Sequence, residues 1–164
     1  MIKTHTKKLS PRLETVLGYV EGRVLADIGT DHAHLPIAAI QRGLVEKAIA
    51  CDCSPGPLQF AVAHVESYAF THRIETRLGF GLRTLAVGEA DCVVITGMGG
   101  MRILEILRDC PDVTASIPRL ILGPQHDLLK VCDALPALGF TLADQKFVQE
   151  KHKNYHIVLA IHTV

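Results

Sequence analysis

The sequence contains no long apolar run and no excess of charge of one sign, and each absence excludes a class of protein. No apolar stretch approaches the ~20 residues that a membrane-spanning helix requires, so we expect no contact with a membrane. The 17 basic and 17 acidic residues balance, which argues against a chain made strongly basic for nucleic acid. Residues 1–10 carry charge but no apolar signal-peptide core, so we expect a cytoplasmic location.

Cysteines and glycines are present, but without the spacings that mark two common kinds of site. The five cysteines do not form the two close pairs of a zinc site, and we interpret Cys51 and Cys53 as buried, reduced thiols. No G-x-G-x-x-G follows an expected strand, so a cradle for a dinucleotide pyrophosphate is poorly supported. With no internal repeat or linker, the 164 residues predict a single domain over residues 1–164.

Short apolar segments alternate with helical patterns along most of the chain. Strands are expected over residues 23–28, 47–51, 73–78, 91–96, 120–122, 141–148 and 155–162. Helices are expected from Pro11, over 34–42, from Pro55 with Leu58, Val62 and Val65 on one face, around 101–108, and over 127–138. This alternation predicts an α/β fold: a mostly parallel seven-stranded sheet with helices on both faces. The last two strands, joined by QEKHKN, predict a C-terminal antiparallel hairpin.

The stretch LADIGTDHAHLP, residues 25–36, carries the strongest chemical signal. Asp27 and Gly29 lie where the first strand ends, and Asp52 ends the second strand. In open α/β sheets, ligands bind outside the carboxyl ends of the strands, and an acid ~20 residues after the first turn accepts ribose hydroxyls. An acid at both strand ends therefore fits S-adenosylmethionine.

The same stretch also spells D-H-x-H with Asp31, His32 and His34, which raises a metal site as an alternative. A closed metal site needs three or four convergent ligands. No second cluster has the required spacing, and His126 and Asp127 would have to converge on the stretch through the fold. We therefore expect no metal.

The segments LSPRL, LADIGTDHAHLPI, CSPGP, RLGFGL and ITGMGG occur in this order along the chain. In order and spacing they resemble the bacterial tRNA (adenine-22-N1)-methyltransferase family. Members of this family are Rossmann-like class I methyltransferases that depend on S-adenosylmethionine. The resemblance extends through KNYHIVLA near the end. It implies S-adenosyl-L-methionine as cofactor, tRNA as partner, and methyl transfer to N1 of an adenine. A methyltransferase on a small-molecule or protein acceptor, and a non-catalytic cofactor-binding module, remain alternatives.

The resemblance also implies roles for individual residues. Asp31 is the implied catalytic group beside the target base. The residues assigned to the cofactor are Asp27, Gly29, Thr30, Asp52, Cys53, Gly79, Phe80, Gly81, Gly97 and Met98. The residues assigned to the substrate are Lys7, Arg12, His32, Gly99 and Gly100.

Three features depart from the family's pattern. Phe80 stands where an acidic or amide residue is usual, so its ring either stacks on another ring or packs in the core. The Q-P-N that follows the fifth strand in the family is here Gly123-Pro124-Gln125, which displaces a polar group on the acceptor side. The family usually continues into a helical domain that helps hold tRNA, whereas this sequence stops at Val164. The sequence therefore supports binding of the cofactor better than it supports tRNA as the substrate.

Overall fold

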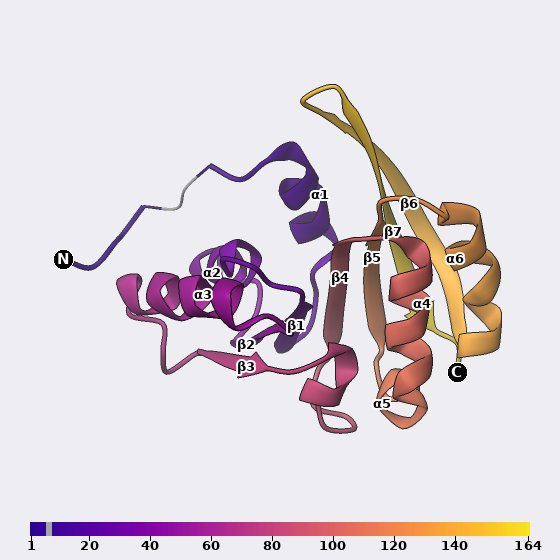
Figure 1. Cartoon of the computed structure of the whole chain (residues 1–164), viewed down its shortest axis with the longest axis horizontal. Helices are drawn as coiled ribbons and strands as arrows, with labels where there is room; N and C mark the ends of the chain where they lie inside the picture. The colour runs from indigo at the N-terminus through magenta and orange to yellow at the C-terminus, as the bar shows by residue number, and fades with distance from the viewer. Residues whose placement is uncertain (6–7) are drawn as a thin grey trace.

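The computed structural model describes residues 1–5 and 8–164, which form one seven-stranded sheet between two layers of helices (Figure 1). The strand order is β3-β2-β1-β4-β5-β7-β6. The strands are β1 Val24–Ile28, β2 Lys47–Asp52, β3 Ile74–Leu78, β4 Cys92–Met98, β5 Arg119–Pro124, β6 Phe140–Glu150 and β7 Lys153–His162. The pairings among β1 to β5 are parallel, whereas β7 runs antiparallel to both β5 and β6. The expected α/β fold with its C-terminal hairpin is confirmed.

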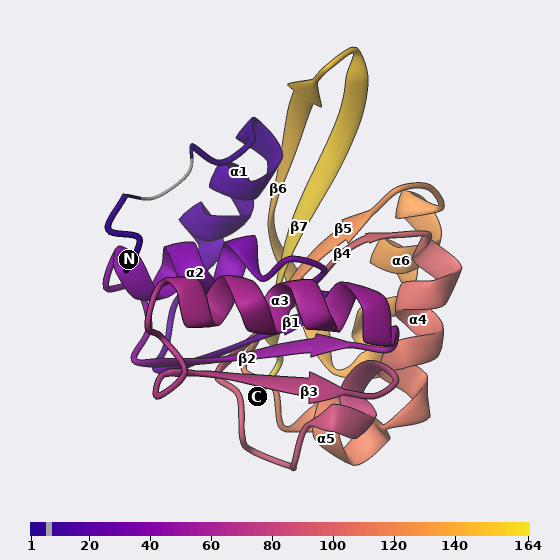
Figure 2. The same cartoon turned by 60° about the vertical axis from the view of Figure 1, so that its left-hand side comes forward.

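The helices divide between the two faces of the sheet (Figures 1 and 2). They are α1 Pro11–Tyr19, α2 His34–Gln41, α3 Pro55–Ser67, α4 Gly100–Asp109, α5 Pro111–Ala115 and α6 Leu128–Ala134, with short 3-10 turns at Gly81–Thr84 and Pro136–Leu138. Helices α1, α2 and α3 cover one face, and α4 and α6 pack on the other. Helices α1, α3 and α5 begin with proline in their first turn, where its missing N–H leaves no intrahelical bond unmade.

The central strands contribute to two cores because successive side chains of a strand point to opposite faces. In β4, Cys92 and Val94 join the core beneath α1, α2 and α3, whereas Val93 and Ile95 join the core beneath α4 and α6. Both faces of such a strand are buried, which is why residues 92–95 form an unbroken apolar run in the sequence.

Two details of the helices differ from the sequence-based expectations. The face of α3 that carries Leu58, Val62 and Val65 is only partly buried: Val62 is exposed, whereas Ala61 and Val65 are buried. Ala61 and Val62 are neighbours in sequence, so periodicity alone does not choose which of them faces the sheet. The helix expected over 127–138 is interrupted, because Pro136 cannot continue the hydrogen-bond ladder and begins a separate 3-10 turn.

Two strand boundaries also differ. Strand β4 runs two residues past its expected end and includes Gly97 and Met98, which pairs with Pro124 after a register shift. The hairpin strands are longer than expected, and only Lys151 and His152 remain in the turn. Both turn residues have positive φ, at 45° and 64°, as tight two-residue hairpins require. The hairpin tip consequently extends beyond the rest of the sheet (Figure 2).

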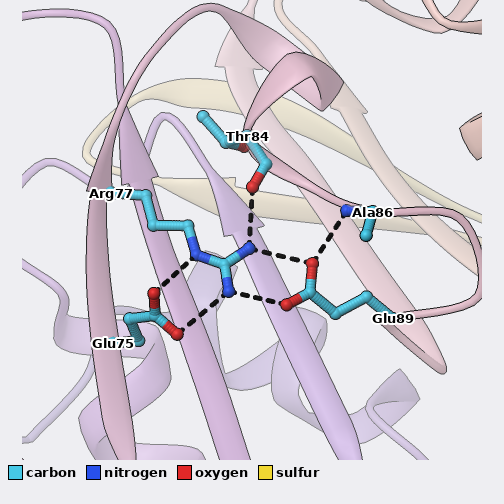
Figure 3. Close-up of polar contacts among 5 residues, drawn as sticks. All are labelled: Glu75, Arg77, Thr84, Ala86 and Glu89. Atoms are coloured by element: carbon cyan, nitrogen blue, oxygen red, sulfur yellow. Dashed lines mark hydrogen bonds and ion pairs between the residues drawn. The ribbon is translucent and has the colours of Figure 1, made fainter.

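Arg77 on β3 fixes the loop that follows this strand (Figure 3). Its guanidinium donates to both carboxylate oxygens of Glu75 at 2.9 Å and to those of Glu89 at 2.6 and 2.8 Å. It also donates to the carbonyl of Thr84 at 2.7 Å. Glu89 in turn accepts from the N–H of Ala86. The segment that begins with Gly79 is therefore held by charge-assisted bonds.

Candidate functional site

The loop after β1 begins with a buried carboxylate. Asp27 is 6% exposed and accepts a hydrogen bond from the Thr30 hydroxyl at 2.9 Å. The pKa of Asp27 is raised to about 7, chiefly by burial and also by the charge of Asp52, against the opposing effect of the Thr30 hydrogen bond. A carboxyl group that titrates near neutrality beside a cleft is a candidate functional group.

Asp52 connects the loops that follow three neighbouring strands. One carboxylate oxygen accepts from the N–H of Asp31 at 3.1 Å, and the other accepts from the N–H of Ser54 at 3.0 Å. The N–H of Gly79 donates to the Asp52 carbonyl at 2.9 Å. Each carboxylate oxygen has a second acceptor position, so Asp52 can still receive a hydroxyl donor.

Asp31 lies past the turn in the left-handed backbone region, with φ 54°, and Ala33 follows with φ 58°. Its backbone is held by Asp52, but its side chain is 69% exposed, with one oxygen 3.7 Å from Nε2 of His32. Left-handed residues other than glycine are uncommon and persist where their surroundings enforce them, often at functional sites. The loop therefore presents the Asp31 carboxylate to solvent from a fixed backbone.

A cavity of about 350 Å³ lies at the carboxyl ends of β1 and β4. These two strands are neighbours in the sheet although β2 and β3 separate them in sequence, so the strand order reverses between them. Such a reversal is where open α/β sheets bind ligands. The walls of the cavity are Arg12, Leu13, Asp27, Gly29, Thr30, Asp31, His32, His34, Leu35, Thr96 and Gly97.

The cavity brings together seven of the residues assigned from the sequence: Arg12, Asp27, Gly29, Thr30, Asp31, His32 and Gly97. Outside its walls are Asp52, Cys53, Gly79, Phe80, Gly81, Met98, Gly99 and Gly100, while Lys7 lies outside the described residues. Sequence reasoning missed Leu13, Leu35 and Thr96 and considered His34 only as a metal ligand. Thr96 carried a usable signal, because it is a polar residue at the end of an apolar strand.

Met98 packs beneath the first loop. A Cβ added to Gly29 would lie 2.6 Å from the Met98 methyl carbon, and Gly29 has φ +75°. The backbone conformation therefore favours glycine, whereas the flexible end of the Met98 side chain could move aside.

Gly99 and Gly100 allow the start of α4 to pack against the segment that follows β5. The N–H of Gly100 donates to the carbonyl of His126 at 3.0 Å, and a Cβ on Gly100 would lie 2.7 Å from that carbonyl oxygen. Gly100 is thus required by close backbone approach, whereas a Cβ on Gly99 would meet the side-chain ring of His126.

Phe80 is half-buried and packs against the core beneath α4. The guanidinium of Arg102 lies 4.6 Å from the centre of its ring, and that of Arg83 lies 5.5 Å away. These distances suit cation–π contacts. Of the two alternatives for Phe80, the structure shows packing of the ring with the core and with two arginines.

Cys51 is buried as expected, but the expectation that Cys53 is buried is wrong, because it follows the end of β2 and is exposed. No three His, Cys, Asp or Glu side chains within residues 1–5 and 8–164 are arranged to hold a metal ion. His126 and Asp127 pair with each other, with 3.0 Å between Nδ1 and Oδ2, and Asp127 also pairs with Lys130. In the same described part of the chain, no helix is long and apolar enough to cross a membrane.

Comparisons with known proteins identify the family and support the fold. A family model described as a methyltransferase domain matches residues 9–158. The tRNA (adenine(22)-N(1))-methyltransferase of Bacillus subtilis strain 168 is 38% identical over 154 residues, which cover 93% of this chain and 65% of that protein. The chain therefore spans just under two thirds of the length of that relative.

Solved structures match over nearly the whole chain. A putative tRNA (m1A22) methyltransferase of Streptococcus pneumoniae, in complex with S-adenosyl-L-methionine, superposes with a TM-score of 0.92 at 34% identity, covering 95% of this chain and 74% of that one. TrmK of M. capricolum, in complex with S-adenosyl-homocysteine, gives a TM-score of 0.84 at 30% identity over 96% of this chain and 70% of that one. The resemblance expected from the motifs is confirmed, and the chain belongs to the methyltransferase-domain family.

Proposed function

We propose that this chain transfers the methyl group of S-adenosyl-L-methionine to N1 of an adenine in tRNA. The observation that carries the proposal is the cavity at the ends of β1 and β4, in which the buried Asp27 and the exposed Asp31 lie on one rigid loop. The 38% identity to the Bacillus subtilis enzyme supports tRNA as the acceptor. Action on tRNA would place the protein in the cytoplasm.

The residues present fit the cofactor. Gly29 allows close approach to the loop backbone, Asp52 offers an acceptor to ribose hydroxyls, and Asp27 offers a buried carboxylate to an ammonium group. An ammonium beside Asp27 favours its ionised form and so opposes the effect of burial. When bound, S-adenosylmethionine supplies an electrophilic methyl group on its sulfonium.

The chain itself needs to provide position and charge. Adenine N1 has a free lone pair, so no side chain has to act as a strong base. Positive charge develops on the ring as N1 is methylated, and the Asp31 carboxylate at the mouth of the cavity would stabilise this charge. Its backbone is already fixed by Asp52, so little reorganisation is needed at the moment of transfer.

Exposed basic residues before α1 and at the hairpin tip supply candidate phosphate contacts. Lys8, Lys151 and Lys153 lie in the segment before α1 and at the hairpin tip, and all three are exposed. An enzyme that methylates a ring nitrogen in tRNA must also unstack the target base, at a cost of a few kcal/mol. Phosphate contacts on either side of the cavity would hold the RNA while this occurs.

A transfer assay tests the proposal directly. The protein is incubated with methyl-labelled S-adenosylmethionine and bulk tRNA, and the nucleosides are then separated. We expect labelled 1-methyladenosine, together with calorimetric binding of S-adenosylhomocysteine. Binding without label in RNA would favour another acceptor or a non-catalytic module, and absence of binding would overturn the proposal altogether.

A further inference from the structure

Arg12 of α1 lines the cofactor cavity and also contacts the C-terminal hairpin, which lies at the other end of the sequence. Its Nη1 lies 3.9 Å from the position of a Cβ on Gly97, at the end of β4. Its guanidinium carbon lies 5.1 Å from the centre of the Tyr155 ring on β7. Its Nε lies 3.9 Å from Oε2 of Glu150 at the end of β6. The side chain is thus held between the hairpin and the cavity.

The hydrogen-bonding capacity of this arginine is not used up by these contacts. A separation of 3.9 Å is too long for a hydrogen bond, and Nε is buried without a hydrogen-bond partner within the described residues. The arginine side chain is 26% exposed and that of Glu150 is 12% exposed, so water screens the pair only in part. A half-buried guanidinium that lacks bonds favours binding of an oxyanion, because a carboxylate accepts two of its N–H groups at once.

The cavity also contains a carboxylate of its own. Asp27 and Arg12 both line it, and the positive charge of Arg12 acts to lower the pKa of Asp27. One cation and one carboxylate in a single cavity complement a ligand end that carries both charges. The methionine end of S-adenosylmethionine is such a group, with an ammonium and a carboxylate on one carbon.

We propose that Arg12 binds the carboxylate of the cofactor's methionine end, and that Tyr155 of the C-terminal hairpin positions the arginine for this contact. The inference rests on the proposed function and deepens it, since it moves Arg12 from the RNA substrate to the cofactor. It also makes the hairpin part of the cofactor site, although Arg12 and Tyr155 lie at opposite ends of the sequence.

Two ligands that differ only at the methionine end test the assignment by calorimetry. S-adenosylhomocysteine carries the amino-acid group, whereas 5′-methylthioadenosine keeps the adenosine and the thioether but lacks that group. For Arg12→Gln we expect affinity for S-adenosylhomocysteine to fall by about ten- to a hundredfold, as for loss of a hydrogen bond to a charged group. Affinity for 5′-methylthioadenosine should change less than about twofold, because no carboxylate is present to be lost.

Matched variants separate this effect from general damage. Arg42→Gln removes an arginine that pairs with Glu14 on the surface, and it should alter neither affinity. Arg12→Lys keeps the charge and should retain part of the preference for S-adenosylhomocysteine, which covers the case that Arg12→Gln folds poorly. An equal loss for both ligands, or no loss, would overturn the assignment.

The role of Tyr155 has its own test. Tyr155→Ala removes the ring beneath the guanidinium and should reduce the preference for S-adenosylhomocysteine over 5′-methylthioadenosine by about two- to tenfold. Tyr155→Phe keeps the ring and should keep the wild-type preference. Failure of the phenylalanine variant to keep the preference would overturn the positioning role.

The outcomes also distinguish the inference from the proposed function. If the wild-type protein binds neither ligand, the proposed function and the inference both fail. If it binds S-adenosylhomocysteine and methylates tRNA but Arg12→Gln keeps the ligand preference, only the inference fails. A loss confined to tRNA affinity, measured without cofactor, would assign Arg12 to RNA instead.

Discussion

Asp27 and Asp31 share one loop but experience different surroundings. Asp27 is buried and bonded to Thr30, whereas Asp31 is fixed through its backbone and exposes its carboxylate. The first can affect stability and cofactor affinity, and the second can act on an incoming acceptor. Substitution by asparagine separates the two roles, because it removes the charge and nearly preserves the shape.

For Asp31→Asn we expect single-turnover methyl transfer to tRNA to slow by about tenfold or more, since the charge that stabilises the developing cation is lost. Affinity for S-adenosylhomocysteine should stay within about twofold of the wild type. Asparagine tolerates the left-handed backbone at this position, so the loop is retained. Asp133→Asn, at an exposed position on α6, is the control. Transfer by Asp31→Asn at the wild-type rate would contradict the catalytic role.

For Asp27→Asn we expect a more stable protein at pH 8. The folded-state pKa of about 7 lies above the usual 3.8, so between these values the folded state keeps a proton that the unfolded state has lost. Stability of the wild type therefore falls as pH rises through this window. The variant carries no charge to bury, and its advantage should grow from near zero at about pH 4 to on the order of 2–4 kcal/mol at pH 8.

Urea unfolding of the Asp27→Asn variant and the wild type across that pH range measures the difference. Asp31→Asn serves as the control, because its side chain is mostly exposed. A constant difference between wild type and Asp27→Asn at every pH would show that Asp27 does not titrate in this window.

At the scale of the elements, β3 and the segment after it depend on Arg77. The pKa of Glu89 is lowered by its hydrogen bonds to this guanidinium, and so is that of Glu75. Both carboxylates therefore favour the folded state when ionised. This contribution is present above their unfolded-state pKa and is lost as pH falls through the lowered folded-state values.

For Arg77→Met we expect the free energy of unfolding at neutral pH to fall by about 1–3 kcal/mol, because two carboxylates lose charge-assisted bonds that are only partly screened. The variant should also lose less stability than the wild type on acidification below about pH 4.5. Arg23→Met removes an exposed partner of Glu46 and should leave the free energy of unfolding nearly unchanged, because solvent screens this pair. A similar small change for Arg77→Met, measured by urea unfolding, would show that this cluster contributes little.

At the scale of the whole molecule, a second cavity of about 600 Å³ lies between the start of α1 and the hairpin tip. It shares Leu13 and His34 with the cofactor cavity, and Lys8 and Lys151 are among its lining residues. A phosphate backbone that enters the site would therefore pass cations contributed by both ends of the chain.

We expect tRNA affinity to fall steeply with salt, because binding releases counterions from the phosphates. Replacing both Lys8 and Lys151 by glutamine should weaken binding on tRNAs of different sequence and reduce the slope of log K against log salt by about 1.4–1.8. Lys47→Gln should leave the slope unchanged, because Lys47 begins β2 and so lies at the amino ends of the strands, away from the cavity at their carboxyl ends. Filter binding at several salt concentrations measures it, and an unaltered slope for the double variant would exclude these phosphate contacts.

Sequence by itself determined the order and type of nearly all the elements. The apolar run 92–95 and the helical spacing of Leu13, Val16 and Leu17 are local patterns, and local patterns of this kind reflect burial. The motif from Asp27 to Asp31 also located the loop of the site, because strand ends in parallel sheets lie at one edge. Sequence did not indicate α5, whose five residues are too few for a periodic pattern.

The tertiary structure alone decided which distant side chains meet. Tyr19 donates to Asp144 across 125 positions, and Arg12 reaches the hairpin through the same packing of α1 against β6 and β7. Tertiary packing likewise placed Met98 beneath Gly29 and left Val62, rather than Ala61, exposed to solvent. Such contacts depend on the order and register of the strands and on the rotation of each helix over the sheet. Those quantities arise from packing of the whole chain, so no local pattern of residues encodes them.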